Sequence, residues 1–247
     1  MNIDILKNDD VINLMSKIEN QSILLSDLST VKAGLKAYEI GKGDPPQTKE
    51  IKDGRVYHSK TKIDSNYIKY LDGKNVCRYY SGWSGEYLKH GKNLAAPRNN
   101  FDLFSSPRIL VRQIPSQPPY CINAFFTKEI ILNDLNSMNV IDIKIEPELI
   151  LSILNSKLVS YWFIHKFGKL QRGIFPQFKV NELAIFPIPK EFGNHRNELI
   201  DKVKKIMDCK SKNPNDDVSR FSREIDNIIY QIYNLTPDEV AIIEDAI

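Results

Sequence analysis

Apolar residues recur every three to four positions in four stretches of the chain, which is the spacing of one face of an α-helix. The stretches are residues 9–20, 147–167, 191–210 and 218–233. The second opens on Pro147, which suits the first helical position because its missing N–H is not needed there. A short fifth helix is predicted after Thr236, which can form a capping box with Glu239.

Alternating and β-branched runs predict strands between these helices. The runs are residues 55–62, 76–80, 107–114 and 121–132, with a strand after a turn in 22–34 and a short strand ending in Pro-Ile-Pro at 187–189. In the run 107–114, the alternation places Ile109 and Val111 on one face. Leu110 and Arg112 are expected on the other.

Turn residues and element order complete the predicted architecture. The glycine-rich residues 82–91 suit a hairpin, and residues 41–48 (GKGDPPQT) suit a mobile loop. Strands dominate up to about residue 190, and helices follow. This order predicts an α+β fold, with a mixed β-sheet domain and interspersed helices over residues 1–190. A helical C-terminal region over residues 191–247 would pack on that domain or on a partner.

Composition adds little to this picture. Of the 247 residues, 42% are hydrophobic and 26% charged, as in ordinary globular proteins. No run of about 18 apolar residues predicts a membrane span, and the acidic N-terminus lacks the pattern of a secretory signal. The three cysteines are far apart, which favours reduced thiols. We therefore expect a cytoplasmic protein with no membrane partner.

Charge is distributed unevenly, although the net charge is only +3. Residues 42–112 carry 14 Lys or Arg against 7 Asp or Glu, and residues 157–179 carry 5 against none. Two basic segments in an otherwise acidic chain predict a face that binds a polyanion. Lysines scattered over a solvated surface would give the same counts.

The sequence offers little that could carry catalysis. It has no Gly-x-Ser-x-Gly, His-Glu-x-x-His or Walker motif, and its four histidines show no metal-ligand spacing. Residues 117–120 (Gln-Pro-Pro-Tyr) resemble the Pro-Pro-aromatic motif of amino-methyltransferases, but Gln stands where Asp, Asn or Ser is usual. No glycine-rich turn for S-adenosylmethionine is present either, so we interpret the match as coincidental and expect no cofactor in this chain.

Two other functions stay open. Asp44, Glu50 and Lys52 imitate a nuclease site in which carboxylates hold Mg²⁺, so a small Mg²⁺-dependent DNA nuclease is one alternative. The apolar stripe of residues 221–232 could pair with a partner subunit, so an interaction domain is the other. Packing of that stripe on its own domain is the simpler interpretation.

A DNA-binding site is better supported, because cations, amides and aromatic side chains alternate in the two basic segments. Arg and Lys can bind phosphate oxygens or the acceptors of guanine, and Gln can pair with adenine. Some of the aromatic residues could equally belong to the core. The residues predicted to contact double-stranded DNA are Lys60, Lys62, Arg78, Tyr80, Trp83, Arg112, Gln113, Lys169, Gln171, Arg172, Gln177 and Lys179.

A series of short phrases gives the chain a family resemblance. In order they are RVYH at 55–58, LDGKNVCRY at 71–79, WSGEYL at 83–88, PRILVRQ at 107–113, LNSKL at 154–158, a Gly-x-x-x-x-Gly-x-x-Pro loop at 168–176, FPIP at 186–189 and EIDNIIYQIYNLTPDE at 224–239. Together they resemble the TaqI-like C-terminal specificity domain of type IIG restriction–modification enzymes and adenine-specific DNA methyltransferases. The last phrase is also similar to helical regions of type I specificity subunits.

The resemblance implies a module that docks on double-stranded DNA and reads a recognition sequence without being catalytic by itself. Its parent enzyme would be an N6-adenine DNA methyltransferase or type II restriction enzyme. S-adenosylmethionine and Mg²⁺ would bind only to catalytic domains outside this chain. A methyltransferase or nuclease domain or subunit of the same system would be its partner. Residues 1–190 would form the target-recognition domain.

Overall fold

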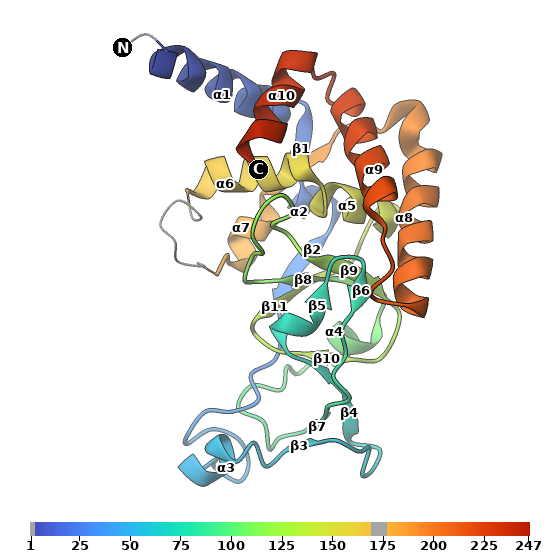
Figure 1. The fold of residues 1–247 in the computed structure, drawn as a ribbon. Helices are drawn as coiled ribbons and strands as arrows, with labels where there is room; N and C mark the ends of the chain where they lie inside the picture. The colour runs from blue at the N-terminus through green and yellow to red at the C-terminus, as the bar shows by residue number, and fades with distance from the viewer. Residues whose placement is uncertain (1–2, 169–176) are drawn as a thin grey trace.

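A four-stranded antiparallel sheet lies at the centre of the computed structural model, which describes residues 3–168 and 177–247 (Figure 1). In spatial order its strands are β2 (Thr30–Ala33), β11 (Ser137–Ile141), β8 (Arg108–Arg112) and β9 (Ala124–Thr127). The register places Arg112 opposite Ser137 and Ile109 opposite Val140. The sheet stands between a helical end and a loop-rich end of the molecule.

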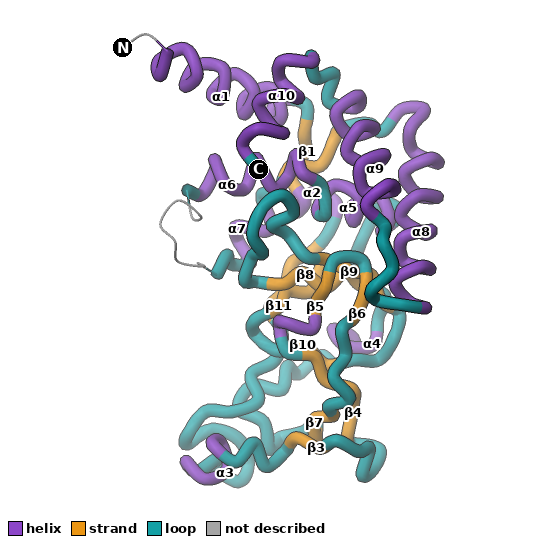
Figure 2. Tube along the Cα trace, in the orientation of Figure 1, coloured by secondary structure: helices purple, strands orange, loops and turns teal. Residues whose placement is uncertain are grey.

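Most of the helical residues gather at one end (Figure 2). The helices there are α1 (Ile3–Asn20), α2 (Leu25–Leu28), α5 (Pro147–Leu154), α6 (Lys157–Phe167), α7 (Val180–Ala184), α8 (Arg196–Lys212), α9 (Ser219–Ile232) and α10 (Pro237–Ala246), with a 3-10 turn η3 (Gly193–His195) before α8. Among them, β1 (Ser22–Leu24) pairs antiparallel with β12 (Pro187–Pro189). The predicted short strand ending in Pro-Ile-Pro is therefore confirmed.

The two faces of β8 lie in different hydrophobic clusters. Ile109 and Val111 are fully buried in the main core, together with the apolar residues of α5 and α6. Leu110 points to the other face and packs in a smaller cluster with Leu71, Val76, Phe125 and Ile131. The alternation predicted for residues 107–114 is confirmed. The main core also takes residues from α8, α9 and α10, so the C-terminal helices share it with the central sheet.

The loop-rich end contains a second sheet with its own small core. Its strands, in order, are β10 (Leu132–Asn133), β4 (Tyr67–Leu71), β7 (Tyr87–Lys89) and β3 (His58–Ser59). The short elements around it are α3 (Lys49–Asp53), the 3-10 turn η1 (Gly73–Asn75), β5 (Val76–Cys77), β6 (Tyr80–Ser81) and α4 (Asp102–Ser105). The hairpin predicted within residues 82–91 is wrong. The hairpin pairs β5 with β6, while β7 pairs with β3 and β4. The predicted α+β class is confirmed.

The long apolar run after residue 147 forms two helices, where the spacing had predicted one. The chain turns at Asn155, whose side chain bonds both backbone groups of Ala124. Asn155 Nδ2 donates to the Ala124 carbonyl at 2.9 Å, and Asn155 Oδ1 accepts from the Ala124 N–H at 3.0 Å. Ser156 then caps α6 by accepting from the Val159 N–H at 3.1 Å. The two Asn155 hydrogen bonds thus hold the junction of α5 and α6 against the edge strand β9.

The loop over residues 41–48, which the sequence predicts to be mobile, is anchored at Gln47, which is only 2% exposed. Its Nε2 donates to the carbonyls of Ala37, at 2.9 Å, and Asn93, at 2.7 Å, and its Oε1 accepts from the Glu39 N–H at 2.9 Å. A buried amide that bonds two segments holds this end of the loop against the protein.

Candidate nucleic-acid interface

A recess of about 260 Å³ opens where β8 ends. We call it the β8 recess, and its lining residues are Asp72, Gly73, Lys74, Arg112, Ile114 and Asn136. The first three come from the junction of β4 and η1, the next two from the end of β8, and Asn136 from the turn between β10 and β11. Three segments distant in sequence therefore meet at one polar surface.

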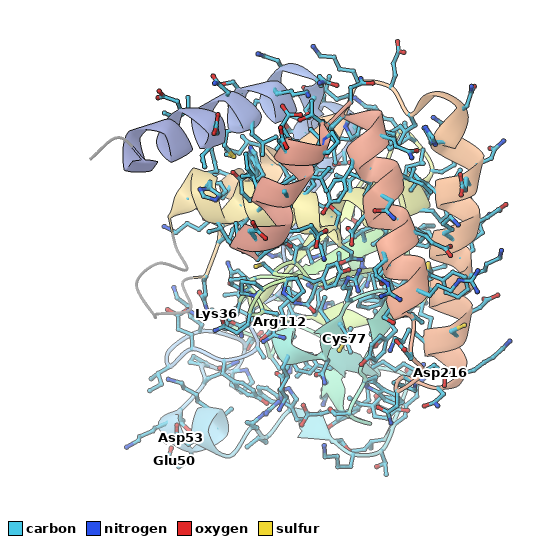
Figure 3. The ribbon with its side chains drawn as sticks, turned by 45° about the horizontal axis from the view of Figure 1, so that its top comes forward. Lys36, Glu50, Asp53, Cys77, Arg112 and Asp216 are labelled. Atoms are coloured by element: carbon cyan, nitrogen blue, oxygen red, sulfur yellow. The ribbon has the colours of Figure 1, made fainter. Side chains whose placement is uncertain are left out.

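Arg112 supplies the strongest hydrogen-bond donor of the recess. It is the last residue of β8, and its backbone N–H donates to the Asn123 carbonyl at 2.9 Å, so its position is fixed by the sheet. Within residues 3–168 and 177–247 its half-buried guanidinium has no hydrogen bond, ion pair or ring contact. Figure 3 shows Arg112 beside the central sheet, away from Glu50 and Asp53 in α3.

The side chains of most other described arginines already have hydrogen-bond partners within the protein. Arg108, which is fully buried, donates to the Asn139 side chain and to three backbone carbonyls, and burial lowers its pKa to about 10. The others that donate from their side chains are Arg55, Arg78, Arg98, Arg196 and Arg220. Arg112 has no such partner among the described residues, so its donors are open to water or to a ligand.

The amide of Asn136 is held in a defined orientation. Its Nδ2 donates to Asp134 Oδ2 at 2.6 Å, and its backbone N–H donates to Asp134 Oδ1 at 3.0 Å. Its Oδ1 then accepts from Gln177 Nε2 at 3.2 Å. Burial raises the pKa of Asp134 to about 6. These contacts connect the recess to the segment that follows α6.

Gly73 allows the wall of the recess to close. A Cβ at this position would lie 2.6 Å from both the Cβ and the carbonyl oxygen of Asn136. Contacts that short do not occur between real Cβ atoms, so no other residue fits without moving the turn. The close approach places Lys74, which is exposed, at the rim.

Four of the predicted DNA contacts lie in or beside this recess. Arg112 lines it, and the Gln113 N–H donates to the Asn136 carbonyl at 2.8 Å. Gln177 bonds Asn136, and the next residue donates its N–H to the Gln113 carbonyl at 3.1 Å. Lys179 follows as an exposed side chain at the start of α7. The predicted contacts Lys169, Gln171 and Arg172 lie outside the described residues.

Arg78, one of the predicted DNA contacts, makes contacts within the protein. Its Nε donates to the Asn155 carbonyl at 3.0 Å, and its guanidinium carbon lies 3.7 Å from the centre of the Tyr120 ring. Tyr120 in turn donates to Asp226 Oδ2 at 2.8 Å. The tyrosine of the Pro-Pro-Tyr segment thus makes a hydrogen bond and a cation–π contact within the protein.

Tyr80 and Trp83 line a second recess of about 330 Å³ that reaches α8. Trp83 is partly buried, and its Nε1 donates to the Glu86 carbonyl at 2.8 Å. Lys69 Nζ lies 5.0 Å from the centre of the Trp83 ring, and Lys210 Nζ lies 5.8 Å from the centre of the Tyr80 ring. This recess shares no lining residue with the β8 recess.

Lys60 and Lys62 lie at the loop-rich end, just after β3. Both are exposed, and Lys60 Nζ is 3.9 Å from Glu86 Oε1. The structure therefore distributes the nine predicted residues that it describes over several places. Among residues that the sequence did not single out, Asp72, Lys74 and Asn136 line the recess. The sequence signals for Asp72 and Lys74 were the basic excess of residues 42–112 and the family phrase at 71–79.

The two alternative functions gain no support from the geometry. Glu50 and Lys52 are exposed on the short helix α3, and across the described part of the chain no three His, Cys, Asp or Glu side chains gather in a way that could hold a metal ion. In α9, Ile225, Ile228 and Ile229 are buried in the main core, so this stripe is not free for a partner.

Residues 68–188 match the model of the TaqI-like C-terminal specificity domain, and this segment contains the whole β8 recess. The segment is a TaqI-like C-terminal specificity domain, as the sequence resemblance predicted. None of the described helices is long and apolar enough to span a membrane.

Similar proteins come from restriction–modification systems. The chain is 30% identical over 191 residues to a Methanocaldococcus jannaschii protein that carries the name of a type II restriction enzyme and methyltransferase, covering 73% of this chain and 16% of that protein. The fold of this chain is similar to that of the type IIL restriction–modification enzyme MmeI, whose structure was solved in complex with DNA. The TM-score is 0.52 at 11% identity, and the alignment covers 89% of this chain and 35% of MmeI. The HsdS subunit from Thermoanaerobacter tengcongensis aligns with a TM-score of 0.39 and 8% identity, over 92% of this chain and 51% of that one. The chain thus spans about a sixth of the named M. jannaschii relative.

Proposed function

We propose that this chain is a double-stranded DNA recognition module of a restriction–modification system and does not itself catalyse a reaction. The observation that carries the proposal is that the segment matching a specificity-domain family contains a rigid recess with an unpaired, half-buried guanidinium among its described residues. Such a group suits hydrogen-bond acceptors on DNA. The basic excess in residues 42–112 supports attraction to the phosphate backbone.

The catalytic steps would belong to another domain or subunit. The similar M. jannaschii protein is about six times longer than the matched part, and its name combines a restriction enzyme with a methyltransferase. In this proposal, S-adenosylmethionine and Mg²⁺ bind to that other domain or subunit. The activity of the parent enzyme would be N6-adenine methylation, restriction or both. The module would act in the cytoplasm, where bacterial or archaeal DNA is found.

Selection from a random double-stranded DNA library tests the proposal. The purified chain is incubated with the library at about 50 and about 150 mM salt, because phosphate contacts weaken with salt whereas base discrimination persists. Enrichment of a motif of several base pairs at both salt concentrations is the expected result. Salt-sensitive binding without a motif would reduce the function to general DNA holding. An absence of binding at either concentration would refute the proposal.

A further inference from the structure

The β8 recess contains a guanidinium and a carboxylate that do not neutralise each other. Arg112 and Asp72 both line it, yet in the part of the chain that the structure describes they form no ion pair. Asp72 is the N-cap residue of η1, and its backbone is held by the turn: its N–H donates to Asn75 Oδ1 at 2.9 Å, and its carbonyl accepts from the Asn75 N–H at 2.9 Å. No side-chain cap hydrogen bond uses the Asp72 carboxylate, so its acceptor positions are available to a donor on a ligand.

The pair of groups specifies the kind of ligand. A guanidinium presents a planar fork of donors, which fits two adjacent acceptors. A phosphate offers such acceptors but has no donor for Asp72, and its negative charge would be repelled by that carboxylate. A base-pair edge that carries two acceptors beside a donor satisfies both side chains.

We infer that the β8 recess reads a G·C base pair in the major groove, an inference that rests on the proposed function. Guanine exposes O6 and N7 as adjacent acceptors, and the paired cytosine exposes its N4 amino donor beside them. Arg112 bonds the guanine acceptors, and Asp72 accepts from the cytosine amino group. Lys74, exposed at the rim, takes a neighbouring phosphate.

The rigidity of the recess supports a reading role. Arg112 ends a central strand, and Asn136 is held by Asp134 on one side and Gln177 on the other. The backbone that carries Arg112 and the amide of Asn136 are therefore in place before binding, and a wrong base would leave the guanidinium without its acceptors.

The test measures binding to duplexes that carry the sequence selected by the wild-type chain. Each base pair is replaced in turn by the other three, and binding is followed by fluorescence anisotropy for the wild type, Arg112→Ala, Arg112→Lys and Asp72→Asn. Arg223→Ala is the matched control, since Arg223 is an exposed arginine on α9 without a side-chain contact among the described residues. Circular dichroism verifies that each variant is folded.

We expect one G·C position at which replacement weakens wild-type binding by about 10- to 100-fold. Arg112→Ala and Arg112→Lys should lose this discrimination at that position alone, because lysine keeps the charge but lacks the fork. Asp72→Asn should reduce it at the same position, and Arg223→Ala should change nothing.

Two results would overturn the inference while leaving the proposed function intact. One is a selected motif whose discrimination survives in Arg112→Lys and Arg112→Ala. The other is an equal loss of affinity for every duplex in Arg112→Ala, which would make the residue a phosphate contact. If the wild type selects no motif, the proposed function fails before any variant is compared, and the inference fails with it.

Discussion

Replacement of Asn155 by alanine tests the contact that separates α5 from α6. Asn155 is fully buried, and its side chain is the partner of both the N–H and the carbonyl of Ala124. The Ala124 carbonyl also accepts from the Tyr79 N–H at 2.8 Å, so the substitution leaves one buried group, the Ala124 N–H, unpaired, at a cost of about 1–3 kcal/mol. For a chain of this size, that loss corresponds to a decrease in Tm of roughly 2–12 °C.

Urea unfolding followed by both circular dichroism and tryptophan fluorescence measures the effect. Coincident transitions by the two probes establish that a single free energy of unfolding describes the chain. The control is Asn215→Ala, since Asn215 is exposed in the turn after α8, where a substitution should change stability by no more than about 0.5 kcal/mol. An Asn155→Ala variant as stable as the control would refute the reasoning that these two bonds hold the helix break.

Three further predictions concern stability and local order. Burial lowers the pKa of His58 to about 4. As the pH falls from about 6.5 towards 4, the unfolded chain therefore binds a proton at His58 that the folded chain does not, and the folded state loses stability. The wild type should lose more stability over this window than His58→Gln, and parallel pH profiles of the two proteins would contradict this. Tyr120→Phe removes the hydrogen bond to buried Asp226 and should cost about 1–3 kcal/mol in urea unfolding, whereas an unchanged midpoint would show that the bond is not needed. Gln47→Ala removes the hydrogen bonds that anchor the loop over residues 41–48. A lysine-specific protease should then cleave the folded variant after Lys42 faster than the wild type. Equal digestion of variant and wild type would show that other contacts hold the loop.

Local pattern was enough for several elements. The alternation around β8 predicted which side chains share a face because successive side chains of a strand point to opposite faces of the sheet. The capping box at Thr236 predicted the start of α10 for a similarly local reason. The family resemblance was also present in short phrases, and the match over residues 68–188 confirms it.

The local sequence pattern did not predict the structure where a polar side chain hydrogen-bonds to a backbone segment that is distant in sequence. Apolar spacing could not show the break at Asn155, because its cause is Ala124 in another strand. The loop over residues 41–48 has the composition of a mobile turn, but Gln47 is buried and donates to the Asn93 carbonyl, 46 residues away in sequence. In both cases the satisfied hydrogen bonds of a buried amide decide the structure.

The sequence by itself determined the α+β class, the basic segments and the family, because each depends on residue type and order along the chain. Only the tertiary structure decided which cations are available. Arg78, Arg108 and Arg112 lie in the same basic segment, yet Arg78 stacks on Tyr120, Arg108 is fully buried, and Arg112 alone of these three lines the recess. A guanidinium is available to a ligand only if no group elsewhere in the fold already pairs with it, and that is a property of contacts between segments distant in sequence.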